Sequence, residues 1–133
     1  MKSLYILLFF ITFIGCKNVQ KKDAMFLSLD GENTGIKFEN NVKNLHDFNI
    51  FGYRNFYNGG GVAVGDVNND GFQDVLFTSN MGDNKLYINK GNFTFTDITE
   101  KAGIADSNKW STGASMVDIN NDGWIDIYIC NAG

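Results

Sequence analysis

Apolar and polar positions divide the chain into one long apolar run near its start and a series of short alternating segments further on. From about position 61 onward, stretches rich in β-forming residues alternate with clusters of Gly, Asn and Asp, the residues that favour turns. The alternation predicts four short strands in a row. These strands are expected at Gly61–Gly65, Asp74–Thr78, Lys85–Asn89 and Phe93–Thr99.

Two parts of this pattern match each other. Residues 61–77 and 113–129 share an apolar strand, an Asp/Asn/Gly loop and a second strand, and Asp66 and Asp118 hold the same place in the two copies, about 52 positions apart (118 − 66). A four-stranded unit repeated at this spacing is typical of a propeller blade. We therefore predict an all-β fold, a partial β-propeller of about one and a half four-stranded blades. A β-sandwich is the alternative, but the long regular period favours the propeller.

The second copy runs out at Gly133, after its second strand. Stacked repeats need neighbours to bury their faces, and propellers have four or more blades. We therefore expect residues 33–133 to be the start of a propeller that is truncated at its C-terminus. Within it, Thr34–Asn40 is expected to be a strand, and the irregular, aromatic-rich residues 41–58 are expected to cover the core rather than to bind a ligand.

The apolar run near the start indicates export. Residues 4–14 are too few to span a bilayer but suit the apolar part of a secretory signal. Gly15 and Cys16 end the run and resemble a bacterial lipobox, so we predict a lipoprotein signal peptide at 1–15, a lipid anchor to the membrane at Cys16 and a polar tether at 16–32. The expected location is the cell envelope, at the outer membrane or cell surface. An ordinary signal peptide with an incidental cysteine, or a buried N-terminal helix, is the alternative.

The two matched loops carry the candidate chemistry. Each places oxygen-bearing side chains at its positions 1, 3, 5 and 9, a glycine at position 6 and a backbone carbonyl at position 7, as in the front of a calcium loop. Ca²⁺ takes six to eight hard oxygen ligands, and the glycine permits the sharp turn. The predicted metal ligands are Asp66, Asn68, Asp70, Phe72 and Asp74 in the first loop, and Asp118, Asn120, Asp122, Trp124 and Asp126 in the second.

These loops are not EF-hands. Position 12, where an EF-hand has glutamate, holds Phe77 in the first loop and Ile129 in the second. A plain turn is the alternative reading, since Asn-Asn-Asp-Gly is a good turn sequence. A turn does not need the aspartate at position 9, however, and three carboxylates within nine residues repel each other without a cation. We therefore expect about two Ca²⁺ ions in this chain, and calcium rather than magnesium because the ligand set is large and flexible.

Several phrases of the sequence resemble a known family. The loops resemble FG-GAP/VCBS repeats of integrin-type and bacterial propellers. The wider context, from about Gly35 to Gly133, is similar to the cartilage-acidic-protein-like family, whose members often end in an ASPIC/UnbV domain. This resemblance implies a propeller with one calcium per blade loop and an extracellular binding role. The phrases that carry it are Thr34–Phe38, Tyr57–Ala63, Leu86–Gly91 and Phe95–Ile104.

Composition narrows the function further. The formal net charge of −4 and the lack of a basic patch argue against a nucleic-acid partner, and Gly 15 with Pro 0 suits short strands and tight turns. The single histidine, His46, lies in the irregular region, and Cys130 lies in an apolar strand, where a buried structural thiol is favoured over a nucleophile. We therefore predict a binding module for a glycan or protein ligand, not an enzyme. The alternative is the N-terminal part of a propeller hydrolase or lyase whose catalytic residues lie beyond this chain.

Overall fold

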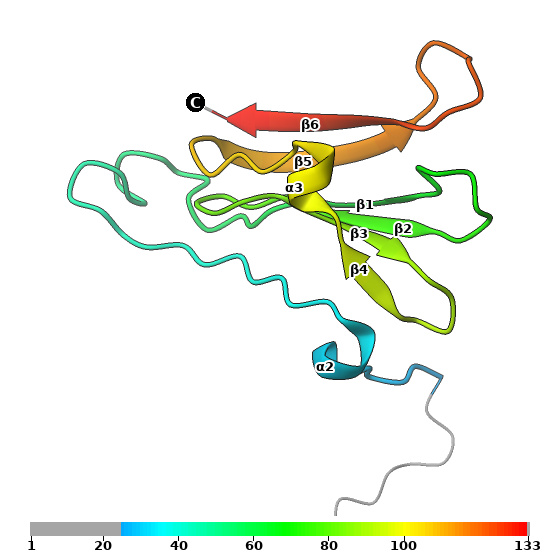
Figure 1. Cartoon of the computed structure of the whole chain (residues 1–133). Coiled ribbons are helices and arrows are strands. Elements are labelled where there is room, and N and C mark those ends of the chain that lie inside the picture. Colours follow the sequence, from blue (N-terminus) through cyan, green and yellow to red (C-terminus); the bar gives the residue numbers. More distant parts are fainter. Residues whose placement is uncertain (1–24, 133) are drawn as a thin grey trace, which may run out of the picture.

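The computed structural model of the protein describes residues 25–132, which form two antiparallel β-sheets stacked in two layers (Figure 1). The first sheet has the strand order β1-β2-β3-β4, and the second consists of β5 and β6. The strands and two one-turn helices are α2 (Gly31–Thr34), β1 (Val62–Gly65), β2 (Asp74–Phe77), β3 (Lys85–Asn89), β4 (Phe95–Asp97), α3 (Thr99–Ala102), β5 (Trp110–Val117) and β6 (Asp126–Ala132). The predicted all-β architecture is confirmed, with one four-stranded unit and the first two strands of the next.

The core lies between the two layers. Ala63, Leu76 and Leu86 pair across β1, β2 and β3, so their side chains point to the same face of the first sheet. The second sheet covers that face with four partly buried apolar side chains from β5 and β6: Ala114, Met116, Ile127 and Ile129. The layers approach closely at Gly65, where an added Cβ would lie 3.0 Å from the Met116 Cβ.

The fourth strand is shorter than predicted. The expected strand Phe93–Thr99 is reduced to Phe95–Asp97, because Phe93 has a positive φ of 57° and belongs to the preceding turn. At the other end, Thr99 begins α3. The amide of Thr99 donates to the Asp97 carboxylate at 2.9 Å, which ends the strand at that aspartate.

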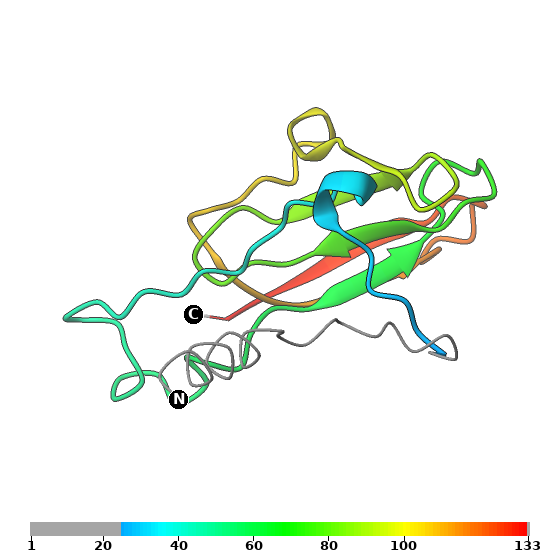
Figure 2. The ribbon, with the colours of Figure 1, turned by 90° about the horizontal axis from the view of Figure 1, so that it is seen from below.

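The expectation of a strand at Thr34–Asn40 is wrong. Residues 31–34 form α2 instead, which Asp30 caps through the amide of Glu32 and Gly35 ends with a φ of 82°. Residues 36–40, which we call the strap, run across the outer face of the first sheet without joining its ladder (Figure 2). Phe38 stacks on Phe77 at 4.9 Å between ring centroids.

Besides this stacking, hydrogen bonds that involve side chains hold the strap. The Lys37 amide donates to the Tyr87 hydroxyl at 3.3 Å. Further along, the Asn40 amide group donates to the Asn80 side-chain oxygen at 2.7 Å and accepts from the Asn80 amide at 3.0 Å. The strap therefore covers β2 and β3 by side-chain contacts, where a strand would have used its backbone.

The aromatic residues between the strap and β1 cover the core in part, as predicted. Phe48, Tyr53 and Phe56 surround Trp110 at the start of β5, with ring centroids 4.9–5.7 Å from the indole. Phe56 is fully buried, whereas Phe51 is 97% exposed. The cluster therefore closes one end of the second sheet with only some of the aromatic side chains.

One ion pair links the third and fourth strands. The Lys85 ammonium lies 3.2 Å from the Asp97 carboxylate. Its hydrogen bond to Asp97 raises the pKa of Lys85. Burial pushes the pKa of Asp97 upward, but the hydrogen bonds from Thr99 and the contact with Lys85 outweigh burial, so the pKa of Asp97 is lowered.

Two further expectations from the sequence concern the burial of Cys130 and the signal peptide at the start of the chain. The expectation that Cys130 is buried is wrong: in β6 it is a free, exposed cysteine, because strand alternation turns Ile129 toward the core and Cys130 away from it.

The predicted signal peptide and Cys16 lie outside the described residues. Between residues 25 and 132, neither helix is long or apolar enough to cross a bilayer.

Candidate metal centre

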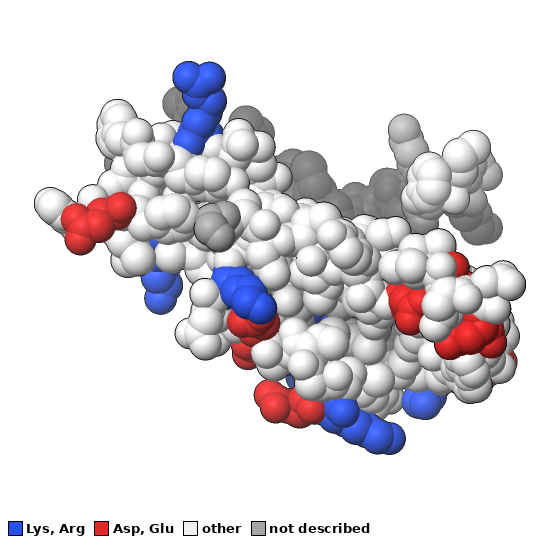
Figure 3. Space-filling model, turned by 90° about the horizontal axis from the view of Figure 1, so that it is seen from above, with Lys and Arg blue, Asp and Glu red and all other residues white. Residues whose placement is uncertain are grey.

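The two aspartate-rich loops lie at the same end of the two layers. The first loop (residues 66–74) joins β1 to β2, and the second loop (residues 118–126) joins β5 to β6 (Figure 1). The loops touch, since the Asn69 side-chain amide donates to the Gly123 carbonyl at 3.2 Å. Acidic side chains gather at this end of the molecule when it is seen from above (Figure 3).

The first aspartate of each loop holds the turn. The two carboxylate oxygens of Asp66 accept from the amides of Asp70 at 3.1 Å and Gly71 at 2.8 Å. Asp118 makes the same two bonds, to Asp122 and Gly123, at the same 3.1 and 2.8 Å. Both loops therefore curl around the carboxylate at position 1.

Positions 3 and 5 also repeat. In the first loop Asn68 accepts from the Asp70 amide at 3.1 Å and donates to the Asp70 carboxylate at 2.9 Å, and the Phe72 amide donates to that carboxylate at 2.9 Å. The sequence predicts a ligand carbonyl from Phe72. The structure adds that its N–H points to the aspartate at position 5.

The second loop has the same bonds among Asn120, Asp122 and Trp124, at the same three distances. The Trp124 amide, and after it the Asn120 side chain, lower the pKa of Asp122, because both donate hydrogen bonds to its carboxylate. A carboxylate held ionised in this way keeps the charge that a cation site requires.

The backbone of both loops needs left-handed residues at positions 4 and 6. Asn69 and Asn121 have φ values of 56° and 60°, and Gly71 and Gly123 have 87° and 88°. A Cβ added at either glycine would meet nothing within 4 Å, so the glycines are required by conformation and not by space. The predicted role of the glycine at position 6 is thus confirmed as a turn requirement.

Position 9 distinguishes the two loops. Asp74 is fully buried, and its two oxygens accept from the Val67 amide at 3.0 Å and the Asn89 amide at 2.8 Å. Asp126 is only partly buried, and in the described part of the chain it accepts from the Ile119 amide alone, at 3.0 Å. Asp74 therefore ties the first loop to β3, a role that loop spacing did not predict.

The donor set suits a hard divalent cation. Each loop supplies three carboxylates and an asparagine oxygen, the ligand types that Ca²⁺ prefers. Each carboxylate oxygen in the first loop accepts one hydrogen bond and keeps a second lone pair. Among residues 25–132, however, no three His, Cys, Asp or Glu side chains converge as a metal-binding group. The ligand types and the turn geometry of the loops fit calcium. In this structure the carboxylates accept hydrogen bonds from backbone amides, mostly of their own loop.

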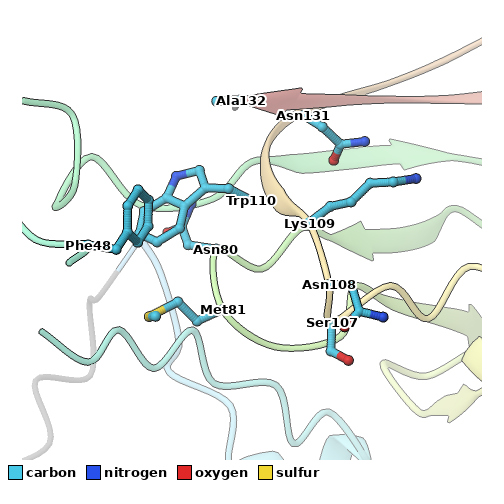
Figure 4. A pocket seen from close by; sticks show the side chains of 9 residues that line it. All are labelled: Phe48, Asn80, Met81, Ser107, Asn108, Lys109, Trp110, Asn131 and Ala132. Atoms are coloured by element: carbon cyan, nitrogen blue, oxygen red, sulfur yellow. The ribbon is translucent and has the colours of Figure 1, made fainter. Parts of the chain in front are cut away.

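A pocket of about 580 Å³ opens at the opposite end of the second sheet (Figure 4). Its wall combines aromatic, amide and hydroxyl side chains with one cation, Lys109, which pairs with Asp106 at 2.7 Å. Within the wall, the buried Asn80 side chain donates to the carbonyls of Gly59 and Ser111. The lining residues are Phe48, Asn80, Met81, Ser107, Asn108, Lys109, Trp110, Asn131 and Ala132.

Two stacked sheets with the same loop at the same end define a β-repeat protein whose repeats carry an Asp/Asn/Gly turn. Comparison with known families gives this repeat its class: residues 66–129 match the family model of the FG-GAP-like repeat. The resemblance to FG-GAP repeats expected from the loops is confirmed.

The chain is also similar to cartilage acidic protein 1 of three vertebrates. Identity is 38% over 78 residues with the protein of Xenopus tropicalis, 36% over 73 residues with that of Mus musculus and 36% over 76 residues with that of Homo sapiens. These segments cover 58%, 55% and 56% of this chain but only 12%, 11% and 12% of the relatives. The match therefore supports the predicted family and extends over a small part of those proteins.

Proposed function

We propose that this chain is a calcium-stabilised binding module, exported and anchored to the cell envelope by a lipid on Cys16. One observation carries the calcium part: two loops 52 positions apart (118 − 66) repeat the same hydrogen bonds at the same distances. A turn sequence does not require a carboxylate at position 9, and both loops have one. The repeated geometry supports selection for a common ligand.

The ligands that we propose for each ion are the side chains at positions 1, 3, 5 and 9 with the backbone carbonyl at position 7. A bound Ca²⁺ supplies positive charge among three carboxylates, and its binding free energy adds to folding free energy. Neither loop has glutamate at position 12, so we expect affinity on the order of 10⁻⁴–10⁻³ M, as in extracellular modules. Such sites fill in the millimolar calcium found outside cells.

The pocket beside Trp110 is the place that we propose for the ligand. Amide and hydroxyl side chains next to aromatic rings suit a neutral sugar or a peptide, which need hydrogen bonds and stacking rather than ionic contacts. The pocket is formed by β5, β6, the loop after β2, the segment before β5 and Phe48, so stability conferred on both repeats keeps much of its wall in place. We propose binding rather than catalysis, because its lining offers no carboxylate, imidazole or thiol.

Calcium titration of four variants tests this proposal. Isothermal calorimetry on the wild-type chain should show two sites, and Asp66→Ala or Asp118→Ala should each leave one. The double variant should bind none. Asp47→Ala, which removes an exposed carboxylate outside the loops, is the matched control and should keep both sites. Unchanged calcium uptake in the double variant would show that the loops are turns alone.

A further inference from the structure

Asn58 and Gly59 form the only Asn-Gly pair of the sequence. In such a pair the amide nitrogen of the glycine can attack the side-chain Cγ of the asparagine and close a five-membered succinimide ring. The attack is intramolecular, so the two reacting groups are already close together, and glycine has no Cβ to obstruct their approach. The pair therefore reacts wherever a fold leaves the asparagine side chain and the glycine amide free.

The fold leaves both reacting groups of this pair free. Asn58 is exposed and lies in a bend between the aromatic-rich segment and β1. Within residues 25–132, the Asn58 side-chain amide makes no hydrogen bond and the Gly59 N–H donates none. A Cβ added at Gly59 would meet nothing within 4 Å, so the space beside the glycine is open. In this part of the chain, no competing hydrogen bond opposes closure of the ring.

Asn55 is a matched site in the same turn that the fold protects. It is exposed like Asn58, and its carbonyl accepts from the Asn58 amide at 3.1 Å. The residue after it is Phe56, which is fully buried and whose amide donates to the Tyr53 carbonyl at 3.0 Å. The nitrogen that would attack Asn55 is therefore engaged. The two asparagines share exposure but differ in the availability of the attacking nitrogen.

The Asp-Gly pairs of the chain could form the same ring, but their groups are engaged too. In the loops, the amides of Gly71 and Gly123 donate to the carboxylates of Asp66 and Asp118 at 2.8 Å. The remaining aspartate before a glycine, Asp30, caps α2 with its carboxylate. Aspartate is also ionised at neutral pH, and a carboxylate is a weaker electrophile than a neutral amide. The structure thus separates the Asn-Gly pair from the three Asp-Gly pairs.

The backbone just after Asn58 has little room to change. The Gly59 carbonyl accepts from the Asn80 side chain at 3.1 Å, and the same Asn80 amide group donates to the Ser111 carbonyl at 3.0 Å. This side chain joins the segment ahead of β1 to the start of β5. At Gly60, an added Cβ would lie 2.0 Å from the Thr78 carbonyl oxygen. A backbone lengthened between residues 58 and 59 would therefore displace the Gly59 carbonyl or Gly60.

We infer that Asn58 is a site of self-modification, at which the chain converts asparagine to aspartate and isoaspartate. The Gly59 nitrogen forms a bond to the Asn58 Cγ, the Cγ–Nδ2 bond breaks, and ammonia leaves with the amide proton. Water then opens the ring. Cleavage of the new Cγ–N bond gives aspartate, and cleavage of the original peptide bond gives isoaspartate, whose backbone is one methylene longer.

The isoaspartate form loses the bond from Asn80 to the Gly59 carbonyl and with it a link between the two sheets. Water is the one co-reactant, so the reaction needs no oxidant and no cofactor. The inference does not depend on calcium or on a bound ligand.

Ageing of the full chain tests this. Protein held in mild detergent at neutral and at mildly alkaline pH should gain isoaspartate, which isoaspartyl methyltransferase labels and electron-transfer fragmentation locates. The change should fall on residue 58, proceed faster at the higher pH because the attacking amide must lose its proton, and precede any change at Asn55. Asn58→Gln keeps an amide but needs a larger ring, so it should abolish the change at residue 58. Asn55→Gln is the matched control and should age like wild type.

A second measurement separates the longer backbone from the added charge. The isoaspartate form, isolated by chromatography, should melt at a lower temperature than fresh protein because the Gly59–Asn80 bond is lost. Asn58→Asp adds a charge at an exposed site without lengthening the backbone, so it should melt like wild type. Absence of conversion at residue 58, equally fast conversion at Asn55, or an isoaspartate form that melts like fresh protein would overturn the inference.

Discussion

Replacing Asp74 should damage the fold far more than replacing Asp126, although both hold position 9 of a loop. The buried Asp74 carboxylate accepts from two backbone amides, those of Val67 and Asn89, at 3.0 and 2.8 Å. Hydrogen bonds to a charged group contribute about 1.5–3 kcal/mol each, so Asp74→Ala should lower the free energy of unfolding by about 3–6 kcal/mol. Asp126→Ala removes one such bond at a wetter site and should cost no more than about 1.5–3 kcal/mol.

Urea denaturation followed by tryptophan fluorescence measures this difference. The samples should contain EDTA, so that a bound cation contributes nothing to either variant. Asp74→Asn is the intermediate case: it keeps one acceptor oxygen, loses the charge and should fall between wild type and Asp74→Ala. It also gives a measurable value if Asp74→Ala does not fold. Equal losses for Asp74→Ala and Asp126→Ala would refute the view that Asp74 ties the first loop to β3.

Three further outcomes are expected. Cys16→Ser should abolish metabolic labelling by palmitate and membrane fractionation, and undiminished labelling would rule out the anchor. Gly71→Ala should cost about 1–2 kcal/mol in thermal melts because φ there is 87°, whereas Gly52→Ala, at a glycine without positive φ, should be near neutral. The pKa of Asp97 is lowered, so its contribution to the free energy of unfolding is present above the unfolded pKa of about 3.9 and is lost as pH falls through the folded pKa. Asp97→Asn should therefore flatten the acid side of a stability–pH profile. An unaltered profile would contradict this.

The sequence predicted the regular part of the fold well, because alternation and turn residues are local signals. Lys85–Asn89 has the predicted bounds, and β1 and β2 differ from prediction by one residue each. The strap was mistaken for a strand because Ile36 and Phe38 are β-formers. Asp30 and Gly35 were the cap signals that pointed to α2 instead. Where helix-capping residues lie next to a run of β-forming residues, β-propensity alone does not predict the local structure.

The site was predicted in its residues but not in all its contacts. Spacing alone identified the turn around Asp66 and Asp118, since those bonds join residues four and five apart. The bond from the Asn89 amide to Asp74 needs the register of β2 on β3, which local patterns do not contain. Cys130 was misplaced for a related reason: an apolar strand sequence does not say which of two alternating faces meets the core.

The strap has a consequence for how the molecule opens. Within residues 25–132, the amides of residues 38–40 donate no hydrogen bond, and the strap is held by the Phe38 ring, the Lys37 amide and the Asn40 side chain. Its amides should therefore exchange with deuterated solvent well before those of β2 and β3, through a local opening that leaves the sheets intact. Such an opening would bare Phe77 beside Val62 and Val64, the two exposed valines of β1, so the opened state would have a wider apolar face than the ground state has.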